Sequence, residues 1–220
     1  MFPLHDANPR HSPSYVTWGL IVANLAVFLY MLSLPLMAEQ RFILVYSFIP
    51  QFFFENPLGN IYRLLSSMFL HGGWAHILGN MFFLYVFGDN IEERMGHGKF
   101  LLFYLLGGVV ATLAHGVFTP SSPIPLVGAS GAISAVLGAY IVLYPRQRIL
   151  TFILPIFVFW LPAWLYLGYW AVLQFVQGVN GWGAEGGGVA WWAHVGGFLF
   201  GMFTVQALAQ PPSQELPEKP

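Results

Sequence analysis

The 220-residue sequence contains no cysteine and few charged side chains. Without cysteine, the chain has no disulfide framework, no thiolate nucleophile and no cysteine-ligated zinc. Charged residues make up only 8% of the chain, whereas an ordinary soluble domain carries roughly 25%. Eight Lys and Arg face nine Asp and Glu, so no basic patch is available to bind nucleic acid. Because 57% of the residues are hydrophobic, we expect an integral membrane protein with no nucleic-acid partner.

The distances between charged residues predict six membrane spans, because a spanning helix needs about 20 mainly apolar residues. The stretch from Lys99 to Arg146 is long enough for two spans, with a proline-rich turn at 119–125 between them. The stretch from Arg148 to Glu185 holds one more, in which Pro155 and Pro162 are expected to kink the helix. The other three spans are expected around Val16–Pro35, Trp74–Gly88 and Trp191–Ala209.

The segment between Arg41 and Glu55 is too short to cross a membrane but too apolar for a solvated loop. We therefore expect an interfacial first outer loop. The predicted fold is an all-α membrane protein: a bundle of six transmembrane helices over residues 16–209. A polar tail at 1–15 precedes it, and a disordered tail at 210–220 follows it.

An even number of spans places both termini on one side of the membrane. If the termini are inside, the inner segments hold six Lys and Arg residues and the outer loops hold two. The positive-inside rule therefore favours a cytoplasmic N-terminus and a cytoplasmic C-terminus.

Polar side chains near the outer ends of three predicted spans are the candidate functional residues. His76 and Asn80 are four residues apart and so share one face of the second span. Ser130 lies near the start of the fourth span and His194 near the start of the sixth. All three spans begin at the outer surface in the predicted topology, so these four side chains lie at a similar depth, which favours one shared site.

Each feature taken singly also has a purely structural explanation. A Gly-x-Ser-Gly segment can be a face of small residues for helix packing, and His or Asn in a span can hydrogen-bond to a neighbouring helix. In the functional interpretation, Gly131, Gly197 and Gly201 let two helices approach closely enough for Ser130 and His194 to touch.

These residues resemble the motifs of the rhomboid family of intramembrane serine proteases. The family's Gly-x-Ser-Gly, Ala-His-x-x-Gly and His-x-x-x-Asn patterns correspond to Gly128–Gly131, Ala193–Gly197 and His76–Asn80. Tyr62-Arg63 in the first outer loop and the Glu-x-Arg-x-Gly of residues 92–96 also fit the family. The resemblance covers about residues 16–209, on a six-helix frame of the prokaryotic type.

The resemblance implies a serine endopeptidase that cuts in or near the transmembrane segment of single-pass membrane proteins, in a prokaryotic plasma membrane. Ser130 is then the nucleophile and His194 the general base, which form a dyad. The Ser130 backbone N–H, His76 and Asn80 are the expected oxyanion donors. Gly128, Gly131, Gly197 and Gly201 pack the helices at the site, and neither a metal nor a cofactor is expected.

One position departs from the family pattern. Many bacterial members carry a Tyr one helical turn after the serine, stacked on the histidine, and Ser134 stands there in this chain. A carboxylate to orient His194 is not expected. Asp89, Glu92 and Glu93 fall at the inner end of the second span, and Glu185, on the correct side, lies in a glycine-rich loop.

Two alternatives stay open. A catalytically silent relative would bind or escort membrane-protein clients, although such relatives have lost the serine or the histidine. A metalloprotease could use His71, His76, His115 and His194, but the chain has no His-Glu-x-x-His motif. His71 is expected instead to help fold the loop before the second span, and His115 to bond between helices.

Overall fold

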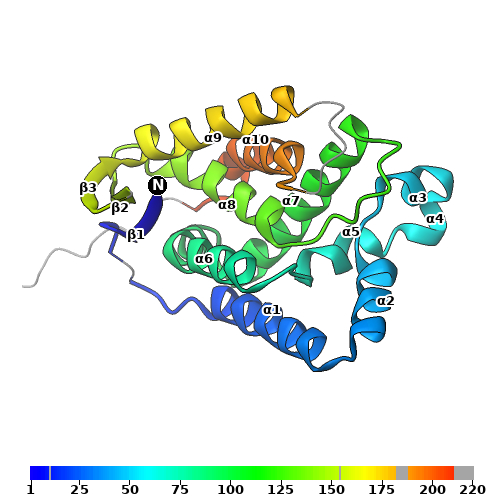
Figure 1. Cartoon of the computed structure of the whole chain (residues 1–220). Helices are drawn as coiled ribbons and strands as arrows, with labels where there is room; N and C mark the ends of the chain where they lie inside the picture. Colours follow the sequence, from blue (N-terminus) through cyan, green and yellow to red (C-terminus); the bar gives the residue numbers. More distant parts are fainter. Residues whose placement is uncertain (10, 154, 182–187, 211–220) are drawn as a thin grey trace, which may run out of the picture.

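The computed structural model describes residues 1–9, 11–153, 155–181 and 188–210, and it is mostly helical (Figure 1). Its elements in chain order are β1 (Phe2–Asp6), α1 (Tyr15–Ser33), α2 (Leu36–Tyr46), α3 (Pro50–Glu55), α4 (Pro57–Asn60), α5 (Arg63–Ser66), the 3-10 helix η1 (Ser67–Phe69), α6 (Trp74–Met95), α7 (His97–Phe118), α8 (Ser130–Leu143), β2 (Arg148–Ile153), β3 (Phe157–Pro162), α9 (Ala163–Asn180) and α10 (Trp191–Leu208).

A helix lies in each of the six ranges expected to hold a span, namely α1, α6, α7, α8, α9 and α10. Two of the described helices, α1 and α7, are long and apolar enough to cross a membrane by length and composition alone, and α8 is a shorter apolar helix. Helix α8 packs against α6, α7, α9 and α10, and every residue from Gly131 to Tyr140 is buried. The helix that begins with Ser130 is thus the central one (Figure 1).

Glycines let the backbones of α8 and α10 touch. A Cβ atom on Gly201 would overlap the carbonyl oxygen of Ala135, and one on Gly197 would overlap that of Gly131. Gly138 of α8 makes a similar backbone contact with α10, at Phe198. Small residues permit this close approach, so these glycines set the distance between the two helices.

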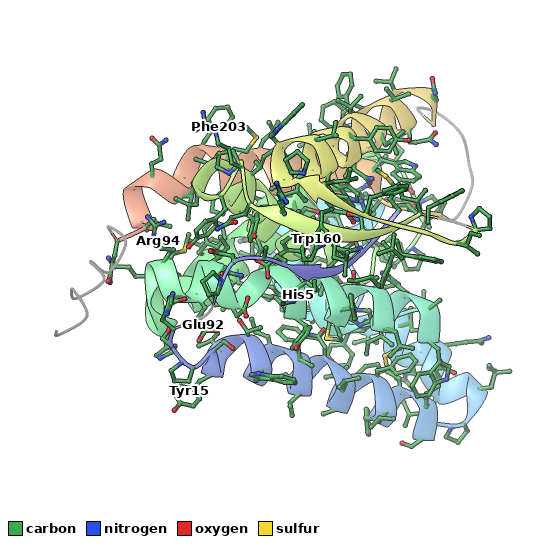
Figure 2. The ribbon with its side chains drawn as sticks, turned by 90° about the vertical axis from the view of Figure 1, so that its left-hand side faces the viewer. His5, Tyr15, Glu92, Arg94, Trp160 and Phe203 are labelled. Atoms are coloured by element: carbon green, nitrogen blue, oxygen red, sulfur yellow. The ribbon has the colours of Figure 1, made fainter. Side chains whose placement is uncertain are left out.

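A three-stranded antiparallel sheet in the order β1-β2-β3 lies at one end of the molecule and was not predicted (Figure 1). His5, Leu150 and Trp160 lie in register across its strands, and Figure 2 labels the outer two of these residues. Pro155 lies in the turn after β2, and Pro162 ends β3 directly before α9. The prediction that these prolines kink one long helix is therefore wrong.

The physical reason is that a short apolar run rich in Ile, Phe and Val fits a strand as well as a buried helix. Proline also lacks the N–H that a helix interior needs and is tolerated at helix starts. The fifth helix therefore begins only after Pro162.

The N-terminal segment is part of the fold and not a separate polar tail. Strand β1 pairs with β2, and the carboxylate of Asp6 accepts hydrogen bonds from Tyr140 Oη of α8 (2.6 Å) and Asn90 Nδ2 of α6 (2.9 Å). Burial raises the pKa of Asp6, and the hydrogen bond from Tyr140 opposes that shift. The predicted boundary at residue 16 is therefore wrong, because β1 supplies an edge strand and a buried carboxylate. Of the predicted tail at 210–220, residues 211–220 lie outside the described part of the chain.

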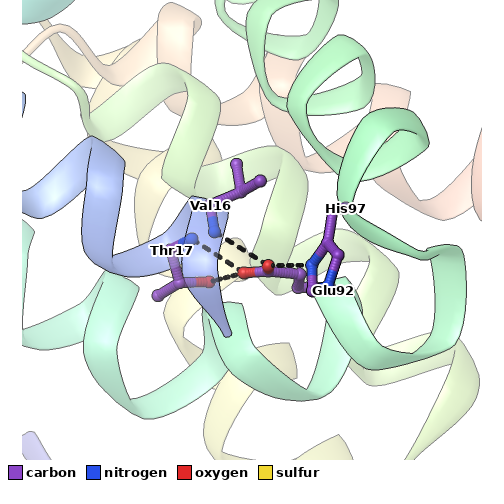
Figure 3. Close-up of polar contacts among 4 residues, drawn as sticks. All are labelled: Val16, Thr17, Glu92 and His97. Carbon is purple, nitrogen blue, oxygen red and sulfur yellow. Dashed lines mark hydrogen bonds and ion pairs between the residues drawn. The ribbon is translucent and has the colours of Figure 1, made fainter. Parts of the chain in front are cut away.

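Glu92 joins α1 to the end of α6 (Figure 3). Its buried carboxylate accepts hydrogen bonds from the backbone N–H of Val16 (2.8 Å), from the backbone N–H and hydroxyl of Thr17 (2.7 and 2.6 Å), and contacts His97 Nδ1 (2.6 Å). The first N–H groups of a helix have no partner within the helix, and a negative charge is favourable there. Figure 2 shows Glu92 near Tyr15, the first residue of α1.

Candidate active site

The side chains of Ser130 and His194 meet although 64 residues separate them in the sequence. Ser130 is the first residue of α8, and His194 lies in the first turn of α10. The Ser130 hydroxyl and His194 Nε2 are 2.8 Å apart. This distance follows from the close packing of α8 on α10, which brings the two helix starts side by side.

A cavity of about 600 Å³ opens next to this pair. His76, Asn80, Ser130 and His194 all line it, so the structure brings together the four polar side chains singled out from the sequence. A cavity of this size with a few convergent polar groups is typical of a binding site.

His76 and Asn80 lie in the first two turns of α6 and face the loop that leads into α8. Gly128 in this loop has a φ of +121°, which favours glycine, and a Cβ atom there would lie 2.7 Å from His76 Nε2. The loop backbone therefore passes directly against the two side chains. Because Ser130 begins a helix, its N–H has no acceptor within that helix.

His71 fixes the amide of Asn80. Its Nε2 lies 2.9 Å from Asn80 Nδ2 and its side chain is buried. Burial, together with the nearby His76, lowers the pKa of His71 to about 4. A neutral His71 can accept a hydrogen bond from Asn80, which leaves the second amide hydrogen of Asn80 free to donate elsewhere. This contact adds to the loop-folding role that the sequence predicted for His71.

His115 does not line this cavity. It lines a smaller cavity of about 180 Å³, and its buried Nδ1 has no hydrogen-bond partner within the described residues. The bond predicted between helices is therefore not made by that atom. Across the same part of the chain, no group of three or more His, Asp or Glu side chains is placed to hold a metal ion.

Two residues of α9 contact His194, and neither contact was predicted from the sequence. Gln174 is buried, and its Oε1 lies 2.6 Å from His194 Nδ1. The ring of Trp170 lies 5.8 Å from the imidazole, centre to centre. The sequence does show Gln174 as a glutamine inside an apolar helix. Polar residues at membrane depth usually have a function or a partner, so this glutamine could have been identified as a candidate. Glu185, the carboxylate considered from the sequence, lies outside the described residues.

Trp170 supplies the aromatic contact to His194 that Ser134 cannot make. The Ser134 hydroxyl donates a hydrogen bond to the Ser130 carbonyl oxygen (2.6 Å) and supplies no aromatic ring. The aromatic ring beside His194 comes instead from Trp170 of α9.

Comparison with known proteins agrees with this helical architecture. A family model described as "Rhomboid domain" matches residues 58–211. The chain is 34% identical to the rhomboid protease GluP of Bacillus subtilis (strain 168) over 71% of this chain and 28% of that protein. It is 31% identical to the human mitochondrial presenilin-associated rhomboid-like protein over 85% of this chain and 46% of that protein. A zebrafish mitochondrial relative, presenilin-associated rhomboid-like protein A, is 32% identical over 76% of this chain and 42% of its own length.

The fold and these matches define a helical integral membrane protein. The chain belongs to the rhomboid family, as the sequence resemblance predicted. It spans less than half the length of these three relatives. Because the relatives include bacterial, mitochondrial and chloroplast proteins, they do not favour the predicted prokaryotic plasma membrane over other membranes.

Proposed function

We propose that this chain is an intramembrane serine endopeptidase that hydrolyses a peptide bond in or near the transmembrane segment of single-pass membrane proteins. The observation that carries the proposal is the 2.8 Å contact between the Ser130 hydroxyl and His194 Nε2 in a cavity large enough for a peptide segment. The name of the bacterial relative, a rhomboid protease, supports the same reaction class.

The proposed reaction begins when His194 Nε2 takes the proton of the Ser130 hydroxyl and the serine oxygen attacks the scissile carbonyl. The C–N bond then breaks, and His194 returns the proton to the leaving amine. A water molecule, deprotonated by His194, then attacks the resulting ester; the ester C–O bond breaks, and His194 returns the proton to the Ser130 oxygen. No step needs a metal or a cofactor.

The oxyanion of the tetrahedral intermediate needs donors that already point at it. His76 and Asn80 line the same cavity as Ser130, and the Ser130 N–H lies at the start of α8, where the helix dipole favours negative charge. These three groups are the proposed donors.

The proposed topology has six membrane-spanning helices with both termini in the cytoplasm, on the side that carries more Lys and Arg. The chain contains no cysteine, so single cysteines can report on the two sides. A cysteine at Ser121 should react with an impermeant maleimide added outside intact cells, and a cysteine at Gln147 should not. The reverse labelling pattern would place the site on the cytoplasmic side.

The enzymatic test uses purified protein and a transmembrane substrate in detergent or lipid. Wild type should cleave the substrate and react with a fluorophosphonate probe, whereas Ser130→Ala and His194→Ala should do neither. The double variant should be no worse than either single variant, because the pair acts as a unit. Cleavage by Ser130→Ala at the wild-type rate would refute the serine mechanism. A folded wild type that neither cleaves nor is labelled would favour the silent escort.

A further inference from the structure

His194 is held from both sides of its ring by hydrogen bonds. On one side, Nε2 contacts the Ser130 hydroxyl at 2.8 Å, and on the other, Nδ1 contacts Gln174 Oε1 at 2.6 Å. Gln174 is 7% exposed and His194 is 9% exposed, so water competes little for either bond. These contacts join α8, α10 and α9 in one chain of polar atoms.

The chemistry of the two contacts fixes where the imidazole proton lies. A neutral imidazole has one N–H donor and one acceptor nitrogen. The amide oxygen of Gln174 can only accept, so the proton belongs on Nδ1 and the lone pair of Nε2 faces the serine hydroxyl. That tautomer is the one in which His194 can take a proton from Ser130.

We propose that Gln174 is a positioning residue that selects this tautomer and ring orientation of His194, and so completes a Ser-His-Gln arrangement. The inference rests on the proposed protease function. A neutral amide does the orienting, and it avoids the cost of a buried carboxylate in an apolar bundle.

A second contact from the same helix supports this role. Trp170 is four residues before Gln174, so both side chains share one face of α9. The Trp170 ring packs beside the His194 ring at 5.8 Å and at an interplanar angle of 33°. Helix α9 therefore restrains both the edge and the face of the imidazole, and the orientation of the base depends on where α9 lies.

The test compares Gln174→Leu with Gln174→Glu and with the control Gln177→Leu. Gln177 lies on the same helix but is exposed. Gln174→Leu should lower kcat about a hundredfold, the scale expected for a misplaced reacting group, and leave KM within about twofold. Gln174→Glu retains an acceptor for Nδ1 and should recover most of the lost rate, whereas Gln177→Leu should behave as wild type.

Nitrogen NMR of histidine-labelled protein gives a readout that does not need catalysis. In the Ser130→Ala background, His194 should be protonated on Nδ1, and adding Gln174→Leu should abolish that preference. The His194 signal is assigned by its absence in a His194→Gln variant.

A folded Gln174→Leu protein that keeps the wild-type kcat, or keeps the Nδ1 tautomer, would overturn the proposal. Failure of the proposed function itself would appear differently, as Ser130-independent cleavage or an inactive wild type. If Gln174→Leu does not fold, the tautomer comparison is made with Gln174→Met.

Discussion

The α8–α10 contact predicts that adding one methyl group at Gly201 damages both stability and activity. A Cβ atom there would overlap the Ala135 carbonyl oxygen and lie 2.8 Å from the Ala135 carbonyl carbon and 2.9 Å from Ala139 N. All three are backbone atoms of the central helix, so no side-chain rotation can relieve the overlap. The helices must move apart instead.

The size of the effect follows from that movement. Carbon atoms pack at about 3.5–4.0 Å, so relief at Gly201 requires a local separation of about 1 Å. Overpacking of this kind costs about 1–3 kcal/mol of unfolding free energy. For a chain of this length that corresponds to a fall in Tm of about 2–12 °C. Because the same helix pair holds Ser130 and His194 at 2.8 Å, such a shift should also lower kcat about a hundredfold.

The assay is thermal unfolding together with cleavage of a transmembrane substrate. The control is Gly19→Ala, since a Cβ on this exposed glycine of α1 would meet nothing within 4 Å. That change should be neutral, or stabilise the protein by up to about 1 kcal/mol, because alanine favours helix. A Gly201→Ala protein with the wild-type Tm and kcat would refute the argument that backbone contact sets the active-site distance.

Three further predictions concern polar side chains at the site and at the end of α6. Asn80→Ala and His76→Ala should each lower kcat about ten- to a thousandfold with less change in KM; wild-type kinetics in both would make them structural residues only. Glu92→Gln should reduce the unfolding free energy by about 1–3 kcal/mol, because a charged acceptor of buried donors is lost. The control Glu93→Gln changes a less buried neighbour and should alter the unfolding free energy little. Urea or thermal unfolding measures both variants. The pKa of His71 is about 4 in the fold and near its ordinary 6.5 when unfolded, so the fold favours the neutral form. Stability should therefore fall as pH drops from about 6.5 towards 4, and His71→Gln, which cannot titrate, should show a smaller fall in Tm over that range; identical profiles would contradict the assignment.

The sequence by itself determined the helices and the residues of the candidate site. Apolar stretches between charges indicated six helices, because an apolar helix leaves a long and recognisable run. The expected starts at Val16, Trp74 and Trp191 agree with α1, α6 and α10 to within one residue, but α6 continues past the predicted Gly88 to Met95, and the fifth helix begins only after the β2–β3 hairpin. The sequence also placed Ser130 and His194 at matching ends of two helices. Successive spans run in opposite directions, so the second, fourth and sixth spans all start on the same side of the membrane. The glycines at 197 and 201 already indicated a close approach.

Only the tertiary structure decided the β-sheet and the partners of the buried polar groups. The hairpin at 148–162 is built from short apolar runs that are compatible with either a strand or a helix, so pairing with β1 had to select the strand. Gln174 is a polar residue on an apolar helix, and the neighbouring sequence does not indicate which other helix its side chain meets. It contacts His194 because α9 packs on α10 in that rotation, and Glu92 caps α1 across 75 residues for the same kind of reason. Helix periodicity is a local property, whereas the partner of a buried hydrogen-bonding group depends on how whole helices pack.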